Sequence, residues 1–117
     1  MLKRLALLLI TFAAFCGPAA AQQLTEEEDV VLWCGSAFFW LGTNASDSGD
    51  NKEADLYQTW SETLMARGVS LLKADQLTPD QIAHVVDAYD NSVVAELGTP
   101  KARHDVTKCP DLLTKTN

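Results

Sequence analysis

The sequence predicts an all-α protein: a small three-helix bundle followed by a short C-terminal helical segment, closed by one disulfide. Apolar residues recur at three- and four-residue spacing over long segments, which is the period of helices that bury one face. Capping residues precede these segments, and turn-forming residues follow them. Two cysteines, Cys34 and Cys109, remain once an N-terminal leader is removed.

The first 21 residues have the layout of a secretory signal peptide. Lys3 and Arg4 give a positive start, residues 5–16 form an apolar run, and Ala19–Ala21 offer small side chains at a cleavage site. Cleavage there leaves residues 22–117 as a single small helical domain. We therefore expect the domain to be periplasmic or secreted.

Two other interpretations of the leader are weaker. An uncleaved membrane anchor needs about 20 uninterrupted apolar residues, whereas Gly17-Pro18 breaks this run early. A lipoprotein needs small residues before its modified cysteine, whereas Phe15 precedes Cys16. We therefore expect no stable membrane anchor, and Cys16 leaves with the leader.

The exported chain would be strongly acidic. The full sequence has nine Lys and Arg against 16 Asp and Glu, a net charge of −7, and loss of Lys3 and Arg4 takes it to −9. Such a charge repels phosphate backbones and anionic lipid headgroups, so we expect no nucleic-acid binding and no electrostatic docking to membranes. A cationic protein partner would be attracted, although the same charge also serves solubility alone.

The first helix is expected to begin at a capping box. The Thr25 hydroxyl and the Glu28 carboxylate would each accept a hydrogen bond from an otherwise unpaired backbone N–H group. Residues 30–41 are almost wholly apolar, and a helix that is apolar on all sides is buried by its neighbours. Gly42 is expected to end this helix, and the turn-rich residues 43–51 to form a loop.

A second helix is expected over residues 52–74, with an apolar stripe at helical spacing. Gly68 weakens the interior of this helix, so it marks either a bend or a place where another helix approaches closely. The stripe comprises Leu56, Tyr57, Trp60, Leu64, Met65, Val69, Leu71 and Leu72.

A third helix is expected to start at Thr78-Pro79, which supplies a cap and a proline at the first helical position, and to end at Gly98. Residues 106–113 offer one more short apolar face. The stripe of the third helix comprises Ile82, Val85, Val86, Tyr89, Val93 and Leu97.

Two cysteines in an exported domain allow one intramolecular disulfide, between Cys34 and Cys109. The bond would pin the tail across the first helix and close a loop spanning nearly the whole domain. A redox-active pair is disfavoured because the spacing is not Cys-x-x-Cys. A bond between two copies is the other alternative.

No residue set predicts a catalytic, cofactor-binding or metal site. Residues 44–55 can be aligned with a calcium loop, but Asn44 and Asp55 stand where such loops carry Asp and Glu. A solvated, turn-rich loop explains these residues better.

Histidine next to carboxylates is the other candidate for chemistry. His84 shares a helical face with Asp80 and Asp87, an arrangement that can orient a general base. That face lies away from the apolar stripe, so we interpret the three as exposed surface charges. His104 beside Asp105 has the same interpretation.

Three tryptophans, Trp33, Trp40 and Trp60, line either an apolar pocket or the core. Trp33 and Trp40 lie seven residues apart and share a helical face. The area that each side chain buries favours the core.

Three function classes remain. The first is an exported, non-enzymatic interaction protein that binds or inhibits a basic protein, which the net charge favours. The second is an acid-stress periplasmic chaperone, because protonation of the 16 carboxylates would loosen acidic surfaces. The third is a small envelope enzyme, for which His84 and its two aspartates are the candidate.

Overall fold

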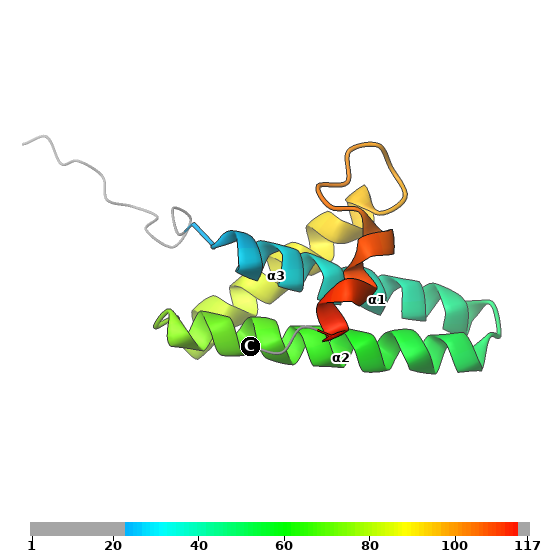
Figure 1. The fold of residues 1–117 in the computed structure, drawn as a ribbon, viewed down its shortest axis with the longest axis horizontal. Coiled ribbons are helices and arrows are strands. Elements are labelled where there is room, and N and C mark those ends of the chain that lie inside the picture. Colours follow the sequence, from blue (N-terminus) through cyan, green and yellow to red (C-terminus); the bar gives the residue numbers. More distant parts are fainter. Residues whose placement is uncertain (1–22, 115–117) are drawn as a thin grey trace, which may run out of the picture.

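The structure, a computed structural model, describes residues 23–114. Helix α1 spans Glu26–Asp47, α2 spans Asn51–Ala74, α3 spans Pro79–Glu96, and the 3-10 helix η1 spans Val106–Thr114. The three α-helices form a bundle, and η1 crosses α1 and α2 (Figure 1). The predicted three-helix bundle with a short C-terminal segment is confirmed. The predicted leader, residues 1–21, lies outside the described residues.

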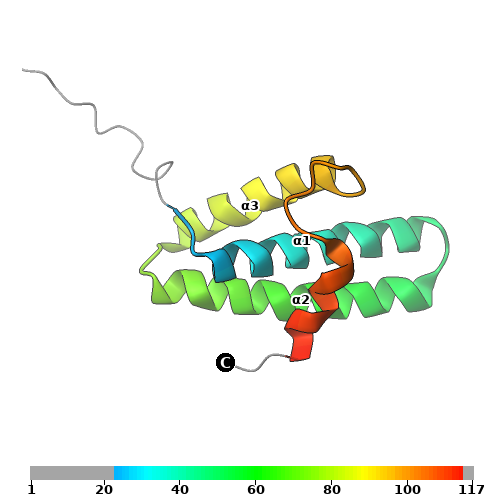
Figure 2. The ribbon, with the colours of Figure 1, turned by 45° about the horizontal axis from the view of Figure 1, so that its top comes forward.

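Helix α1 is the centre of the bundle because it lies between α2 and α3 (Figure 2). Every residue from Val31 to Phe38 is buried, as its apolar sequence predicts. Phe39 departs from this pattern, since 47% of it is exposed.

Among the helices of residues 23–114, none has an apolar stretch of the length that a membrane span needs.

Both predicted capping signals are present. The Thr25 hydroxyl accepts a hydrogen bond from the backbone N–H of Glu28 at 3.1 Å, and the Glu28 carboxylate accepts one from the backbone N–H of Thr25 at 2.9 Å. Thr78 and Gln81 repeat this arrangement at the start of α3, with Pro79 in the first turn. These caps set where α1 and α3 begin, because they pair backbone groups that the helix leaves free.

The prediction that α1 ends at Gly42 is wrong. The helix continues to Asp47, so the loop expected over residues 43–51 shrinks to a tight reversal in which Gly49 adopts a φ of +84°. Gly42 serves packing instead: a Cβ atom there would lie 3.3 Å from Cβ of Tyr57 on α2. Gly42 therefore does not end the helix but allows α1 and α2 to approach closely.

Gly68 on α2 also marks a close approach, which is one of its two predicted roles. A Cβ atom there would lie 2.6 Å from Cδ2 of Leu32 on α1. Ser61 on α2 adds a tie between the same helices, because its hydroxyl donates to the backbone carbonyl of Gly35 at 2.7 Å. These contacts bring the backbones of α1 and α2 together along their length.

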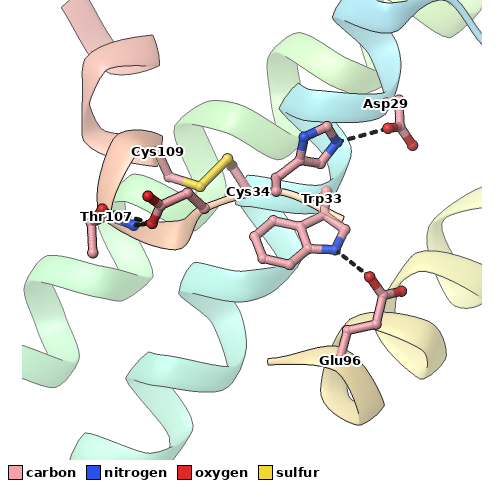
Figure 3. The surroundings of a disulfide bond; sticks show 8 residues. Asp29, Trp33, Cys34, Glu96, Thr107 and Cys109 are labelled. Atoms are coloured by element: carbon pink, nitrogen blue, oxygen red, sulfur yellow. Dashed lines mark hydrogen bonds and ion pairs between the residues drawn. A yellow bond between two sulfur atoms is a disulfide. The ribbon is translucent and has the colours of Figure 1, made fainter. Parts of the chain in front are cut away.

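The predicted disulfide is present and joins α1 to η1 (Figure 3). Cys34 and Cys109 have Cα atoms 5.5 Å apart, and each is only 1% exposed. Arg67 on α2 also holds η1, since its guanidinium donates to the backbone carbonyl of Leu112 at 2.6 Å. The tail is therefore fixed to both long helices.

Candidate functional site

Asp29, in the first turns of α1, is the centre of a cluster of polar side chains that fastens the segment between α3 and η1. Its Oδ2 lies 2.7 Å from Nε2 of His104 (Figure 3), and its Oδ1 lies 3.3 Å from Nη1 of Arg103. The Tyr89 hydroxyl on α3 donates to Oδ1 at 2.5 Å. One carboxylate thus links α1, α3 and the connecting segment.

Glu96, at the end of α3, extends this cluster. Its Oε2 lies 2.7 Å from Nη2 of Arg103, and its Oε1 accepts from Nε of the same guanidinium at 3.2 Å. The indole N–H of Trp33 donates to Oε1 at 3.2 Å (Figure 3). Such two-point contact fixes the orientation of a guanidinium as well as its position.

The contacts lower the pKa of both carboxyl groups. Burial alone would raise the pKa of Asp29, but hydrogen bonds to Tyr89 and His104 and the charges of His104 and Arg103 hold it below its ordinary value. Hydrogen bonding to Arg103 lowers the pKa of Glu96. Both groups are therefore ionised at neutral pH, where they hold the connecting segment most strongly.

The interpretation of His104 as a plain surface charge is wrong. Its side chain is only 27% exposed, because it pairs with Asp29 and packs edge-on against Trp33, with ring centroids 5.5 Å apart. His84 is exposed together with Asp80 and Asp87, as predicted. The His104–Asp29 pair is separated by 75 residues, so no local sequence pattern could indicate it.

The tryptophans pack into the core and do not share one face of a pocket. Trp33 is fully buried, and the Trp40 indole N–H donates to the backbone carbonyl of Asp90 at 3.0 Å. Trp60 lies against Phe38, with ring centroids 5.2 Å apart. The three rings and the N–H groups of Trp33 and Trp40 therefore serve helix packing, as the favoured interpretation predicts.

The calcium-loop alignment fails because its first residues are helical. Residues 44–47 complete α1 and residues 51–55 begin α2, so the segment is a helical hairpin. Within residues 23–114, no group of three His, Cys, Asp or Glu side chains is placed to hold a metal ion.

A groove of about 720 Å³ runs between α1 and α2 beside this hairpin. The exposed Phe39 lies on it together with three carboxylates, one from α1 and two from α2. No Lys, Arg or His lines it. The sequence does not indicate this groove, because residues 43–47 carry turn-forming side chains where α1 in fact continues. The lining residues are Phe39, Gly42, Thr43, Ser46, Asp47, Asn51, Ala54, Asp55, Gln58, Ser61 and Glu62.

Glu28 is a buried carboxyl group, only 3% exposed. Burial and the neighbouring Asp75 carboxyl raise its pKa, although its capping contacts with Thr25 oppose this. Glu28 and Asp29 are adjacent in sequence, yet their environments shift their pKa values in opposite directions.

No protein-family model, curated protein or solved structure matches this chain.

Proposed function

We propose that this protein is an exported, non-enzymatic interaction protein that binds a cationic protein. The observation that carries the proposal is the number of exposed carboxylates that form no ion pair within the fold. Within residues 23–114, ion pairs engage only Asp29 and Glu96 among the acidic side chains. The exposed acidic residues are Glu26, Glu27, Asp47, Asp50, Glu53, Asp55, Glu62, Asp75, Asp80, Asp87, Asp105 and Asp111.

The arrangement of these charges supports a partner as well as solubility. Solubility alone needs charge of either sign spread over the surface. Here three of the twelve exposed acidic side chains, from both α1 and α2, line one groove that also carries an exposed aromatic ring. A groove lined by one sign of charge concentrates the field and steers an oppositely charged partner into it.

The disulfide supports the export part of the proposal. Disulfides persist in oxidising compartments and are rare in reducing ones. A buried Cys34–Cys109 bond is compatible with an exported protein. Burial also shields the disulfide from thiols in solution, which suits a structural role.

The test is affinity capture on the immobilised protein from an envelope extract of its source, at low salt and neutral pH. We expect a basic protein to be retained and then released by added salt, because screening weakens contacts between exposed charges. The purified protein should then bind in solution with an affinity that falls as salt rises. Retention of nothing, or of proteins that salt does not release, would contradict the proposal.

A second function, an acid-stress chaperone, is favoured by the Asp29 cluster. Asp29 and Glu96 form ion pairs with Arg103 and His104 only while they are ionised, so protonation at low pH removes the ion pairs that hold the connecting segment. The disulfide would still tether η1 at Cys109. Apolar side chains packed beneath this segment would then become accessible.

Dye binding distinguishes this second function. Fluorescence of 8-anilinonaphthalene-1-sulfonate should rise only at a pH below the ordinary carboxyl range of about 4, because the pKa values of Asp29 and Glu96 are lowered. Protection of a client enzyme from aggregation should appear over the same range. A protein that binds no dye and keeps its near-ultraviolet circular dichroism at a pH low enough to protonate both carboxyl groups would eliminate the chaperone and leave the first proposal standing.

A further inference from the structure

We propose that the groove between α1 and α2 is the docking site for the cationic partner, and that its occupant is a short extended segment carrying Lys or Arg next to an apolar side chain. This inference rests on the proposed function and names the surface that performs it. Three properties of the groove support it: its length, its charge and its exposed aromatic ring.

The length of the groove matches a short peptide segment. Its walls are formed by residues 39–47 of α1 and residues 51–62 of α2. At about 1.5 Å per residue these stretches rise by roughly 12–16 Å along the hairpin. An extended chain rises about 3.3 Å per residue, so the groove accommodates about four or five residues of a partner.

The charge of the groove selects a basic segment. Asp47 lies on one wall, and Asp55 and Glu62 lie on the other. Seven residues separate Asp55 from Glu62, which places them roughly 10 Å apart along α2. Two long basic side chains of one segment can reach both. The Gln58 amide donates to the Glu62 carboxylate at 3.3 Å, which orients that carboxylate without neutralising it.

The exposed ring of Phe39 adds an apolar contact. Phe39, at 47% exposed, is one of three large exposed apolar side chains of the described residues, with Leu56 and Val94. Aromatic side chains are enriched in the buried centre of protein interfaces. The same ring can also receive a cation over its face.

Two other occupants fit this groove less well. A second copy of the chain would bring the same carboxylates against those already present, and like charges in contact disfavour association. A metal ion needs converging ligands, and the described residues hold no group of three. The occupant that complements both the carboxylates and the ring is a basic segment with an apolar residue.

The experiment titrates the full chain by calorimetry at low salt with a seven-residue peptide of alternating Lys and Leu. A peptide of alternating Glu and Leu is the control for charge. Two variants alter the groove, Asp55→Asn/Glu62→Gln and Phe39→Ser. Two matched variants remove the same charge or a similar apolar surface from α3, Asp80→Asn/Asp87→Asn and Val94→Ser. All the altered side chains are exposed, and circular dichroism checks that each variant folds.

We expect the Lys–Leu peptide to bind and the Glu–Leu peptide not to bind. Each groove variant should weaken binding by about tenfold, which corresponds to the loss of about two exposed ion pairs or of one buried ring. Each α3 variant should change the affinity by less than about twofold. Equal losses in the groove and α3 variants would overturn the groove assignment while leaving a diffuse form of the proposed function intact. Absence of Lys–Leu binding would overturn the assignment outright, and capture from the extract tests the proposed function independently.

Discussion

Replacing Gly68 by Ala should destabilise the protein, although Ala is the better helix former. In an exposed helix interior this change stabilises by up to about 1 kcal/mol. At Gly68 the new Cβ atom would lie 2.6 Å from Cδ2 and 3.0 Å from Cγ of Leu32. Leu32 is 0% exposed at the centre of the bundle, so its side chain cannot move aside into solvent.

The steric cost outweighs the helix propensity. Inserting a methyl group into a packed core costs about 1–3 kcal/mol, and a contact as short as 2.6 Å belongs near the upper end of that range. Subtracting the propensity gain leaves a net loss of about 1–2 kcal/mol in the free energy of unfolding. For a domain of this size that lowers the Tm by roughly 5–10 °C.

Urea unfolding followed by tryptophan fluorescence measures this loss. Gly35→Ala is the comparison, because its Cβ atom would lie 3.1 Å from Cγ and 3.3 Å from the backbone nitrogen of Met65, which are longer distances than the 2.6 Å at Gly68. We therefore expect Gly35→Ala to cost less than Gly68→Ala. Shortening Leu32 to Ala should cost less in the Gly68→Ala background than in the original protein, since the two groups compete for one space. A Gly68→Ala variant that is more stable than the original would refute the close packing of α1 on α2.

Three further predictions concern the tail and the two adjacent carboxyl groups. Replacing both disulfide cysteines by Ala opens a loop between residues 75 apart, and chemical unfolding should report a loss of about 4 kcal/mol. Asp29→Asn should destabilise by about 1–2 kcal/mol at pH 7. Because the folded pKa of Asp29 is lowered, its stabilisation is fully present above its ordinary pKa and is lost only as the pH falls through the lowered pKa. Thermal scans of Asp29→Asn and the original should therefore differ most at neutral pH and converge only in that acidic range. The pKa of Glu28 is raised by burial, so its contribution is most favourable at low pH and is lost as the pH rises through that pKa. Glu28→Gln keeps an acceptor for the cap, so its stability should equal that of the original near pH 3 and match or exceed it at pH 7. If the stability difference between variant and original moved against the variant from pH 3 to pH 7, that result would contradict the raised pKa.

Local signals in the sequence predicted the helices well. Thr25 and Thr78 begin α1 and α3 as their capping boxes indicate, because those contacts lie within three residues of each other. The pairing of Cys34 with Cys109 followed from the two cysteines that remain if the predicted leader is removed. The end of α1 was predicted wrongly because a glycine such as Gly42 favours both a helix end and a close contact between helices. Only the position of Tyr57 on α2 distinguishes these two roles.

The candidate sites were less accessible to sequence reasoning. The Asp29–His104 pair joins residues 75 apart, and its partners Tyr89 and Arg103 come from two further segments. The groove exists because α1 continues past Gly42 and faces the start of α2. Both features depend on how the helices pack, which periodicity and composition do not report.

Nuclear magnetic resonance mapping of the isotopically labelled full chain during titration with the Lys–Leu peptide tests the groove assignment residue by residue. We expect amide chemical-shift changes to concentrate in residues 39–47 and 51–62 and to shrink when salt is added. The amide shifts of α3 around His84, where carboxylates are also exposed, should not change. Shifts spread evenly over all exposed acidic residues, or centred on α3, would contradict the groove assignment.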